Sequence, residues 1–436
     1  MSILFTDEFQ PGSAAAWKQK IQFELQGSDY NKTLLTPTNE GITIKPFYHA
    51  NYFEKVLVPP SSNKYKICQA VYIKTDEEAN SLALTYIEKG MNSIKFIALK
   101  PFDSTILFQN LLHKNIEFHF HLSFLSEKFI DALCKTLNSE TIYLNIDSIG
   151  NLAKTGNWFT NLNDDFNTIN RLLKKHENKN VIAVNVSIYQ NAGANTVQQV
   201  AYALAHANEY FQKFGAEIAS KIQFNFAIGS NFFFEISKIR AFTYLYQLIC
   251  EQYAIATTPI ICIEPSFRNK TLYNYTNNCQ RTSLEFTSGV YGGAHTILNN
   301  LPNKTNLNQL LSLKDELANN NSQDITTDSY YIESITKQIA EKALSIFKEI
   351  ENGGGFLQQL KDGTIQRKIA ENAKKEQDSF NTGESILVGA NKYKTQTKED
   401  KLNYFSDVLN TQNIRKTLII PIVAKRLSEK IEQKKI

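Results

Sequence analysis

Two histidines, His119 and His121, stand two positions apart in a short apolar run that is typical of a β-strand. Because side chains alternate across a strand, both imidazoles would point to the same face. Imidazole nitrogens are good zinc ligands, so the pair could begin a metal site if a side chain such as Glu264, from another strand end, joined it. Polar side chains in this arrangement are more often hydrogen-bonded to neighbouring strands, and we therefore predict no metal site.

The other glycine, cysteine, serine and carboxylate residues form no known catalytic or binding motif. Gly353-Gly354-Gly355 favours a helix-ending turn over a phosphate cradle, because no strand precedes it and no Gly-Lys-Ser follows it. No G-x-S-x-G motif, Cys-His dyad or pair of carboxylates stands out. The five cysteines are widely spaced and form no Cys-x-x-Cys pair, which predicts free thiols in reducing surroundings. They are Cys68, Cys134, Cys250, Cys262 and Cys279.

The composition is that of an ordinary globular protein. The chain has 436 residues, of which 42% are hydrophobic and 21% charged, so it can bury one large core or two moderate ones. A net charge of +4 is too small to indicate a nucleic-acid partner. We find no apolar run of about 18 residues for a membrane span and no secretory signal at the N-terminus, so we expect no membrane association and a cytoplasmic location.

Short runs rich in Ile, Val, Phe and Tyr alternate with longer segments of helical period, and this alternation predicts the fold. Strict alternation of strands and helices indicates parallel strands with right-handed crossovers, and eight such units close into a (β/α)8 barrel of the TIM type. A doubly wound open sheet is the alternative if the weak eighth strand does not form. The expected strands are 69–73, 94–98, 117–121, 142–146, 181–188, 222–228, 259–264 and 294–299.

Helical segments frame this α/β barrel, which we place at residues 49–300. Residues 1–48 are expected to form an N-terminal helix and an extended arm, and Trp17, Ile21 and Leu25 would share an apolar face that something must cover. Residues 301–436 are expected to form a linker and a C-terminal helical extension. The helices predicted there are 330–351, 356–379 and 418–433.

Several blocks of sequence, in order along the chain, resemble the coenzyme B12-dependent acyl-CoA mutases, of which methylmalonyl-CoA mutase is the best known. The most specific block, residues 226–241, is similar to the family's strand-to-helix passage with Gly-x-Asn-Phe-Phe and Lys-Leu-Arg-Ala. Residues 35–48 resemble its substrate-entry arm, and residues 388–393 its Gly-x-Asn-x-Tyr signature. The resemblance implies that Glu285 keeps the position of a glutamate that reaches the cofactor's sugar, accompanied by Arg281. A structural ion pair between these two residues is an equally good interpretation.

The residues that carry the chemistry in this family are replaced. Matching back from Ala192-Gly193-Ala194 puts Ser187 and Ile188 where the family has a Tyr-His pair, and isoleucine cannot donate a hydrogen bond to a thioester carbonyl. Ala70 stands where a family tyrosine wedges against the corrin, and Thr155 matches a second family arginine. A radical enzyme depends on its protein to orient and shield the cofactor. The resemblance therefore implies a barrel with no catalytic residues of its own.

The cofactor-binding module of the family is also missing. Its signature is Asp-x-His-x-x-Gly, in which the histidine binds cobalt and the aspartate orients that histidine. None of the seven histidines lies in this context, and only about forty residues follow Tyr393, too few for a flavodoxin-like domain. We therefore expect no cobalamin-binding domain and no cofactor bound by this chain.

Many bacterial methylmalonyl-CoA mutases are heterodimers of a catalytic large subunit and a similar small subunit without active-site residues, and this chain resembles the small subunits. The implied function is structural support of a large subunit that holds adenosylcobalamin and interconverts methylmalonyl-CoA and succinyl-CoA. The N-terminal arm and the segment Ala14–Gln26 are the candidates for reaching onto the partner. Two alternatives stay open: the active barrel half of a split B12-dependent mutase, against which Ile188 and Ala70 argue, and a barrel repurposed to bind an acyl-CoA.

Overall fold

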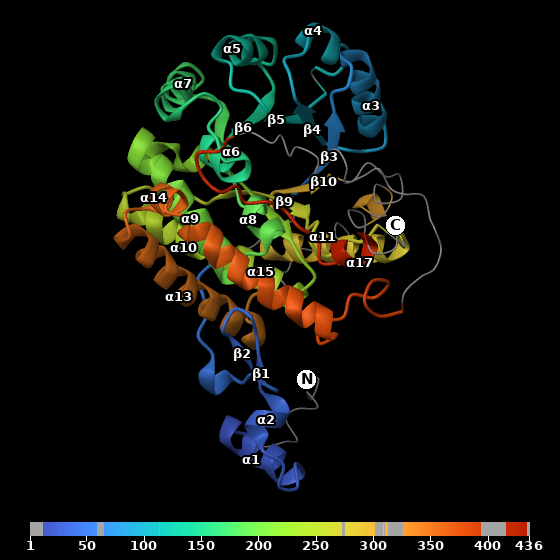
Figure 1. The fold of residues 1–436 in the computed structure, drawn as a ribbon, viewed down its shortest axis with the longest axis vertical. Coiled ribbons are helices and arrows are strands. Elements are labelled where there is room, and N and C mark those ends of the chain that lie inside the picture. The colour runs from blue at the N-terminus through green and yellow to red at the C-terminus, as the bar shows by residue number, and fades with distance from the viewer. Residues whose placement is uncertain are drawn as a thin grey trace, which may run out of the picture.

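Eight parallel strands close into a barrel in the computed structural model, which describes residues 12–58, 65–112, 114–272, 275–300, 308, 310–312, 326–393 and 416–433 (Figure 1). The last strand pairs with the first, Thr296 opposite Lys66, and this pairing closes the ring. The predicted (β/α)8 barrel is confirmed, and the open sheet is wrong. The strands are β3 (Lys66–Tyr72), β4 (Ser93–Ala98), β5 (Glu117–Leu122), β6 (Thr141–Ile146), β7 (Asn180–Asn185), β8 (Gln223–Ile228), β9 (Ile260–Pro265) and β10 (Thr296–Asn299).

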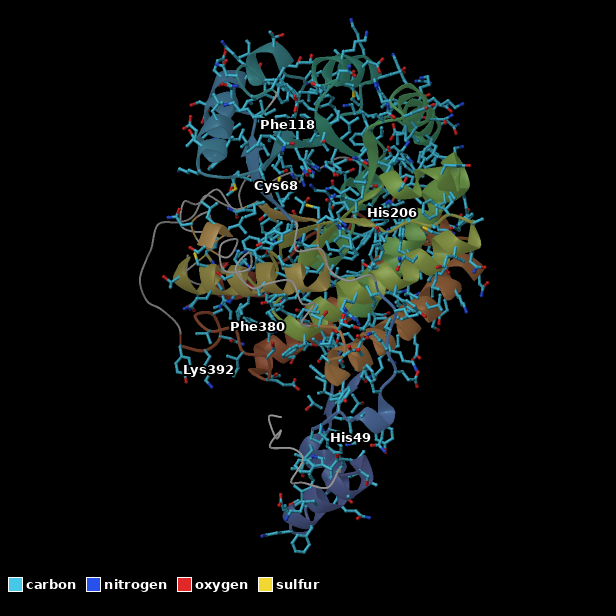
Figure 2. All side chains as sticks on the ribbon, turned by 180° about the vertical axis from the view of Figure 1, so that it is seen from behind. His49, Cys68, Phe118, His206, Phe380 and Lys392 are labelled. Carbon is cyan, nitrogen blue, oxygen red and sulfur yellow. The ribbon has the colours of Figure 1, made fainter. Side chains whose placement is uncertain are left out.

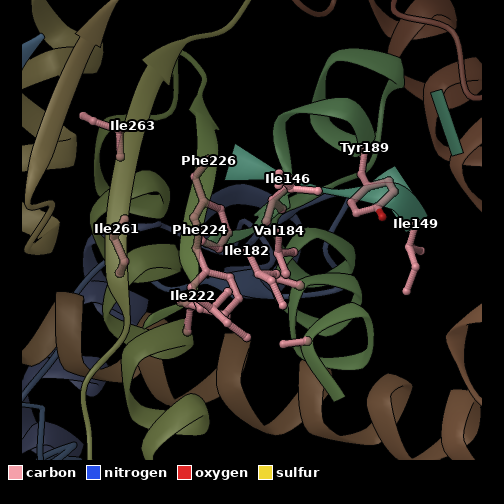
Figure 3. Close-up of a cluster of buried hydrophobic side chains, with 14 of the residues drawn as sticks. Ile146, Ile149, Ile182, Val184, Tyr189, Ile222, Phe224, Phe226, Ile261 and Ile263 are labelled. Carbon is pink, nitrogen blue, oxygen red and sulfur yellow. The ribbon is translucent and has the colours of Figure 1, made fainter. Parts of the chain in front are cut away.

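Helices surround the barrel, and the main hydrophobic core lies between them and the outward faces of the strands. Figure 3 shows part of this core, with Phe224 and Phe226 of β8 beside Ile261 and Ile263 of β9, all fully or almost fully buried. Burying a large apolar side chain is worth roughly 1.5–3 kcal/mol, so this layer provides most of the driving force for folding. The helices between the strands are α3 (Asp76–Glu88), α4 (Ser104–Leu107), α5 (Glu127–Thr136), α6 (Ser148–Thr155), α7 (Leu162–Lys175), α8 (Ser187–Ala192), α9 (Thr196–Phe214), α10 (Phe232–Gln252) and α11 (Tyr275–Gly292).

The chain after β7 differs from its prediction as a strand that continues to Ile188. The strand ends at Asn185, and residues 187–192 form the short helix α8. The apolar run favours a strand locally, but the turn is needed to carry Tyr189 into the core, where its hydroxyl lies 2.9 Å from Nδ1 of His206. Gly193 ends α8 with a φ of +112°, and a Cβ there would lie 2.5 Å from the Cβ of Ala373. Only glycine permits this close approach.

The N-terminal segment forms an arm that projects away from the barrel (Figure 1). It contains α1 (Ala14–Glu24), α2 (Tyr30–Leu34), the strand pair β1 (Thr36–Pro37) and β2 (Thr43–Ile44), and the 3-10 turn η2 (Ala50–Tyr52). Buried Ile42 and the ring of Tyr48, whose centroid lies 5.0 Å from that of Tyr331, attach the arm to the rest of the molecule. Figure 2 shows His49 of this arm in the lower part of the view, well away from the barrel.

The C-terminal extension packs helices against the barrel, with two departures from the prediction. It contains α13 (Tyr330–Asn352), α14 (Phe356–Lys361), α15 (Thr364–Thr382) and α17 (Glu429–Gln433). The predicted turn at Gly353–Gly355 is confirmed, because α13 ends there, but the helix expected over 356–379 is broken at Gly363, whose φ is +73°. Of the helix predicted over 418–433, only Glu429–Gln433 is helical, so the prediction is wrong for residues 418–428. Most of the predicted linker, residues 301–307, 309 and 313–325, lies outside the described residues.

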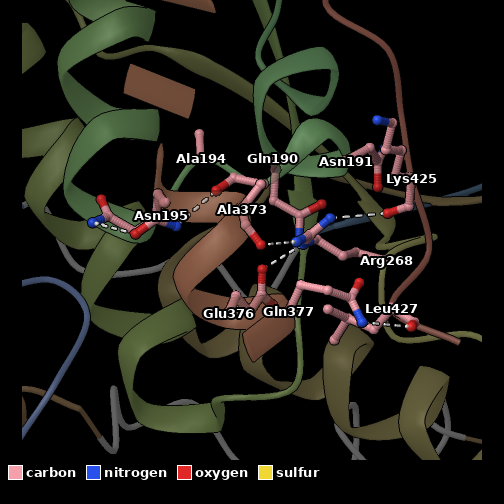
Figure 4. A network of polar contacts seen from close by, with 12 residues as sticks. Gln190, Asn191, Ala194, Asn195, Arg268, Ala373, Glu376, Gln377, Lys425 and Leu427 are labelled. Carbon is pink, nitrogen blue, oxygen red and sulfur yellow. Dashed lines mark hydrogen bonds and ion pairs between the residues drawn. The ribbon is translucent and has the colours of Figure 1, made fainter. Parts of the chain in front are cut away.

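Residues 416–428, which we call the strap, cross the loops at the carboxyl ends of several barrel strands. The strap is irregular because its amides bond to other elements: Leu418 N donates to Gly156 O (2.9 Å), and Ile422 N donates to Ala153 O (2.7 Å). Figure 4 shows the guanidinium of Arg268, after β9, reaching the carbonyl of Lys425 at 3.0 Å and the carboxylate of Glu376 on α15. These bonds replace the i to i−4 bonds of the predicted helix.

Two further features bear on the sequence predictions. All five cysteines are buried and free, as expected. Among the described helices, none has the length and apolar character that crossing a bilayer requires.

Candidate functional site

The inward-facing residues of the barrel strands form a polar lumen, in contrast to the apolar outer layer. Lys95 of β4, His119 of β5 and Tyr143 of β6 lie side by side in register. Their neighbours along the strands, such as Phe96 and Phe118, face outward into the main core. His121 lies two residues farther toward the carboxyl ends of the strands, at the mouth of the barrel where TIM barrels place their active sites.

A hydrogen bond crosses this lumen. Nδ1 of His119 lies 3.1 Å from Oε1 of Gln223, and their strands, β5 and β8, are not neighbours in the barrel. The Gln223 amide nitrogen donates to Oδ1 of Asn225 (2.7 Å), so its oxygen faces the imidazole and His119 donates from Nδ1. The ring of Tyr143 stacks on His119 with centroids 4.4 Å apart. These side chains fill the middle of the barrel.

The surroundings of His119 and His121 are therefore not those of a metal site. His119 bonds across the barrel and not to a neighbouring strand, and Glu264 accepts a hydrogen bond from Asn300 (3.3 Å). Across the described residues, no group of three or more His, Cys, Asp or Glu side chains could hold a metal ion. Burial, with a smaller effect of the Lys95 charge, lowers the pKa of His119 to about 3. Burial also lowers the pKa of His121 to about 3, with the charges of Lys154 and Lys95 adding to the shift.

We predict that buried, neutral His119 makes the protein less stable as the pH falls. Its pKa is about 3 when folded against a reference of 6.5, so the unfolded chain takes up a proton between these values while the folded chain does not. Lowering the pH from 7 to 5 should cost about 2 kcal/mol of unfolding free energy through His119 alone. Urea unfolding of wild type and His119→Gln at both pH values measures this difference.

The control for that experiment is the interval from pH 7 to pH 8, in which the imidazole is neutral in both states. There the difference between wild type and variant should stay constant. An equal pH dependence of both proteins between pH 7 and 5 would show that His119 is protonated in the folded state.

The four positions at which the resemblance implies a loss of the family's chemical side chains have no chemical function visible in their surroundings. Ala70 lies in a small apolar cluster in the lumen with Cys68, Cys262 and Leu298. Ile188 is half-buried and packs against the main core. The remaining two positions, Ser187 and Thr155, carry hydroxyls.

Both hydroxyls are used in local hydrogen bonds. The Ser187 hydroxyl donates to Oδ1 of Asn185 (2.7 Å), and the Thr155 hydroxyl donates to the carbonyl of Asn151 (2.8 Å) at the end of α6. Helices α6 and α8 pack against each other, so Thr155 and Ser187 belong to one region, whereas Ala70 lies on β3. The region contains no acid, base or nucleophile at these positions.

Arg281 and Glu285 do not bond to each other. The carboxylate of Glu285 accepts from Nζ of Lys270 (2.6 Å) and from the amide of Asn269 (2.7 Å), and all three residues are almost fully buried. Arg281 instead donates to Oδ1 of Asn278 (2.8 Å) and to the Val388 carbonyl. Burial raises the pKa of Glu285, and the adjacent Lys270 opposes that shift. Nothing in the Arg-Asn-Lys-Thr run around Lys270 marks it as the partner in the sequence.

A second buried polar cluster, centred on Asp147, was also missed by sequence reasoning. Its carboxylate accepts from Gly150 N (2.7 Å) at the start of α6, from the Tyr210 hydroxyl (2.8 Å) and from Asn185 N (2.8 Å) at the end of β7. Nε2 of His206 lies 3.0 Å from the same carboxylate. Asp147 thereby fixes the start of α6 and the end of β7, the elements next to Thr155 and Ser187. An aspartate before a helix is a capping signal, which could have indicated the first of these bonds.

Comparison with known proteins gives a consistent picture. The family described as methylmalonyl-CoA mutase matches residues 143–433, more than half of the chain. A methylmalonyl-CoA mutase small subunit from Porphyromonas gingivalis is 29% identical over an alignment that covers 91% of this chain and 72% of that protein.

Longer relatives match a smaller share of the chain. The methylmalonyl-CoA mutase of Cereibacter sphaeroides is 31% identical, covering 54% of this chain and 35% of its own length. A methylmalonyl-CoA mutase large subunit from Streptomyces virginiae is 27% identical, covering 54% of this chain and 36% of its own length. The alignments with these two relatives thus span about a third of their length.

Proposed function

This chain belongs to the methylmalonyl-CoA mutase family, and from that membership we propose that it is the non-catalytic, structural subunit of a heterodimeric methylmalonyl-CoA mutase. Its partner is a catalytic large subunit that holds adenosylcobalamin and interconverts methylmalonyl-CoA and succinyl-CoA. Relatives with both subunit names, small and large, support this partnership. The buried free thiols fit a cytoplasmic complex, where reducing conditions keep cysteines unpaired.

The observation that carries the proposal is the filled lumen. The His119–Gln223 bond, with the Tyr143 ring stacked on the imidazole, crosses the middle of the barrel. Opening a path for an acyl-CoA would separate these buried polar partners and leave them unsatisfied, at a cost of about 1–3 kcal/mol for each group. A barrel that is closed in this way supports a structural function and argues against a repurposed acyl-CoA-binding barrel.

The residues at the mouth do not fit a corrin cofactor either. Ala70 is enclosed by apolar neighbours, and the hydroxyls of Thr155 and Ser187 are engaged in local bonds. Glu285, the candidate contact to a cofactor sugar, is held by Lys270 and is 1% exposed. We therefore derive no reaction step through cobalamin for this chain.

The N-terminal arm supports the assignment of a protein partner. Apolar residues on it are exposed, among them Trp17 (55%), Phe23 (80%) and Tyr52 (71%). The apolar face that includes Trp17 is covered in part: the ring of Phe47 meets the Trp17 ring edge to face, with centroids 6.3 Å apart, and Trp17 is still 55% exposed. Exposed aromatic side chains on a projecting segment are typical anchors of protein interfaces. We assign this arm to the contact with the large subunit.

Co-expression with a large subunit tests the proposed function. We expect a stable one-to-one complex with mutase activity, and neither activity nor a corrin absorbance spectrum from this chain alone. The triple variant Ala70→Tyr, Ser187→Tyr, Ile188→His should also remain inactive alone, because restoring three side chains leaves the lumen filled. The matched control removes the two tyrosines and the histidine from the corresponding positions of the large subunit. This change should abolish the activity of the complex.

The outcomes separate the alternatives. Activity of the unmodified chain with a separate B12-binding chain would establish the split enzyme and overturn the proposal. Stabilisation of the isolated chain by acyl-CoA esters in a thermal-shift assay would establish an acyl-CoA-binding barrel instead.

A further inference from the structure

The loops after β7 and β9 meet over the end of β8, the strand that lies between them in the barrel. The hydroxyl of Ser266, after β9, lies 2.8 Å from the amide nitrogen and 3.0 Å from the amide oxygen of Gln190 on α8. Ser266 N also donates to the carbonyl of Ile228, the last residue of β8 (2.9 Å). Residues 190–191 and 266–268 therefore close over this strand, and we call them the roof.

The strap clamps the two halves of the roof together (Figure 4). Within the roof, Phe267 N donates to Oδ1 of Asn191 (3.0 Å). From the strap, Lys425 N donates to the carbonyl of Asn191 (2.9 Å), and Leu427 N donates to the carbonyl of Arg268 (3.0 Å). The guanidinium of Arg268 donates in return to the Lys425 carbonyl (3.0 Å). The strap is thus bonded both to the loop after β7 and to the loop after β9.

The side chain of Arg268 joins the roof and the strap to the C-terminal extension. Besides the strap carbonyl, its guanidinium contacts the carboxylate of Glu376 and the carbonyl of Ala373 (3.3 Å), both on α15. Gly193 leaves room for it, since a Cβ at that position would lie 3.2 Å from Cζ of Arg268. Hydrogen bonds from a charged donor are roughly twice as strong as neutral ones. Arg268, which is only 5% exposed, therefore holds three elements in one arrangement.

A thiol lies beneath the roof. Cys262 of β9 is paired with Asn225, two residues farther along β8 than Gln223. It faces the lumen in the apolar cluster that includes Ala70. Cys262 is therefore on the mouth side of the His119–Gln223 bond, and it is 3% exposed. Burial raises the pKa of its thiol, and because the thiolate is the reactive form, Cys262 should not react with a thiol reagent while the roof is closed.

We propose that the roof and the strap form a locked lid over this side of the barrel mouth, with Arg268 as its latch. TIM barrels admit their ligands at this end, through the loops that follow the strands. Here two of those loops are bonded to each other and then to the strap, so that small molecules are kept from the part of the lumen below the roof. The lid is a property of the chain by itself and does not depend on the structural function proposed above.

Alkylation of the full chain with N-ethylmaleimide, followed for each cysteine by mass spectrometry, tests the lid. Cys262 should be protected in the wild type and should react at least about ten-fold faster in Arg268→Met, the effect of losing one charge-assisted contact. The outer cysteines, Cys134 on α5 and Cys250 on α10, are buried in the core outside the barrel strands and should keep their rates. Hydrogen exchange of the strap amides should speed up in the same variant, because their partners in the roof are released.

Glu376→Gln is a milder variant that keeps both carbonyl contacts of Arg268. It should speed the reaction of Cys262 at least about three-fold, and it decides the question if circular dichroism shows that Arg268→Met is unfolded. Arg171→Met, which removes an exposed ion pair from α7, is the matched control and should leave Cys262 protected.

Three results would overturn the proposal. They are rapid alkylation of Cys262 in the wild type, an unchanged rate in the folded latch variants, and a parallel rise at the outer cysteines, which would show a general loss of stability instead of an opened lid. None of these results involves the large subunit. The structural function is therefore tested separately, by co-expression.

Discussion

Removing residues 1–34 should abolish complex formation with the large subunit while the barrel remains folded. The deletion takes away α1 and α2, which project from the molecule, and keeps Ile42 and Tyr48, which attach the rest of the arm. Loss of buried aromatic anchors typically costs 2 kcal/mol or more for each one, so we expect affinity to fall by at least about a hundred-fold. Analytical ultracentrifugation of the co-expressed subunits measures the association, and circular dichroism reports the fold.

Point variants locate the effect within the arm. Trp17→Ser and Phe23→Ser should each weaken the complex, because both side chains are largely exposed in the isolated chain. Gln19→Ser, an exposed polar position on the same helix, is the matched control and should change little. A complex of unaltered affinity after removal of residues 1–34 would show that the large subunit binds elsewhere.

Breaking the buried ion pair between Lys270 and Glu285 should strongly reduce the stability of the protein. Each side chain is 1% exposed, and the ammonium lies 2.6 Å from the carboxylate. Lys270→Met should lower the free energy of unfolding by about 3–5 kcal/mol, because it leaves an uncompensated charge in the interior. Urea unfolding at neutral pH measures the loss, and the double variant Lys270→Met, Glu285→Gln should recover part of it.

The control for this prediction is an ion pair near the surface. Lys175, which pairs with Asp131, is half exposed, and Lys175→Met should lower the free energy of unfolding far less than Lys270→Met, because solvent screens an exposed pair. Losses of similar size in the two lysine variants would contradict a structural role for the Lys270–Glu285 pair. In that case Glu285 would again be a candidate for binding a ligand.

Much of the barrel could be predicted from the sequence because its signals are local. Strand and helix alternation depends on the spacing of apolar residues, and seven of the eight expected strands agree closely with the structure. The prediction of a strand up to Ile188 was wrong because the bond of Tyr189 to His206 is a distant contact. The predicted helix over 418–433 was wrong for the same kind of reason, since the strap amides bond to α6 and other distant elements.

The candidate site was less predictable. The spacing of His119 and His121 indicated a shared face, but not that His119 bonds to Gln223 across the lumen. The replacement of the family's chemical residues at Ala70, Thr155, Ser187 and Ile188 stays a prediction from the resemblance. What surrounds these positions could only come from the structure.

The sequence by itself determined which side chains are present, how they alternate between the two faces of each strand, and that strands and helices alternate along the chain, which favours a (β/α)8 barrel. Only the tertiary structure decided which of those side chains meet: Lys270 with Glu285, His119 with Gln223, and Asp147 with Tyr210. The physical reason is that periodicity is a property of neighbours along the chain, whereas a lumen is closed by strands far apart in sequence. Their register and the direction of each side chain are set when the whole ring closes.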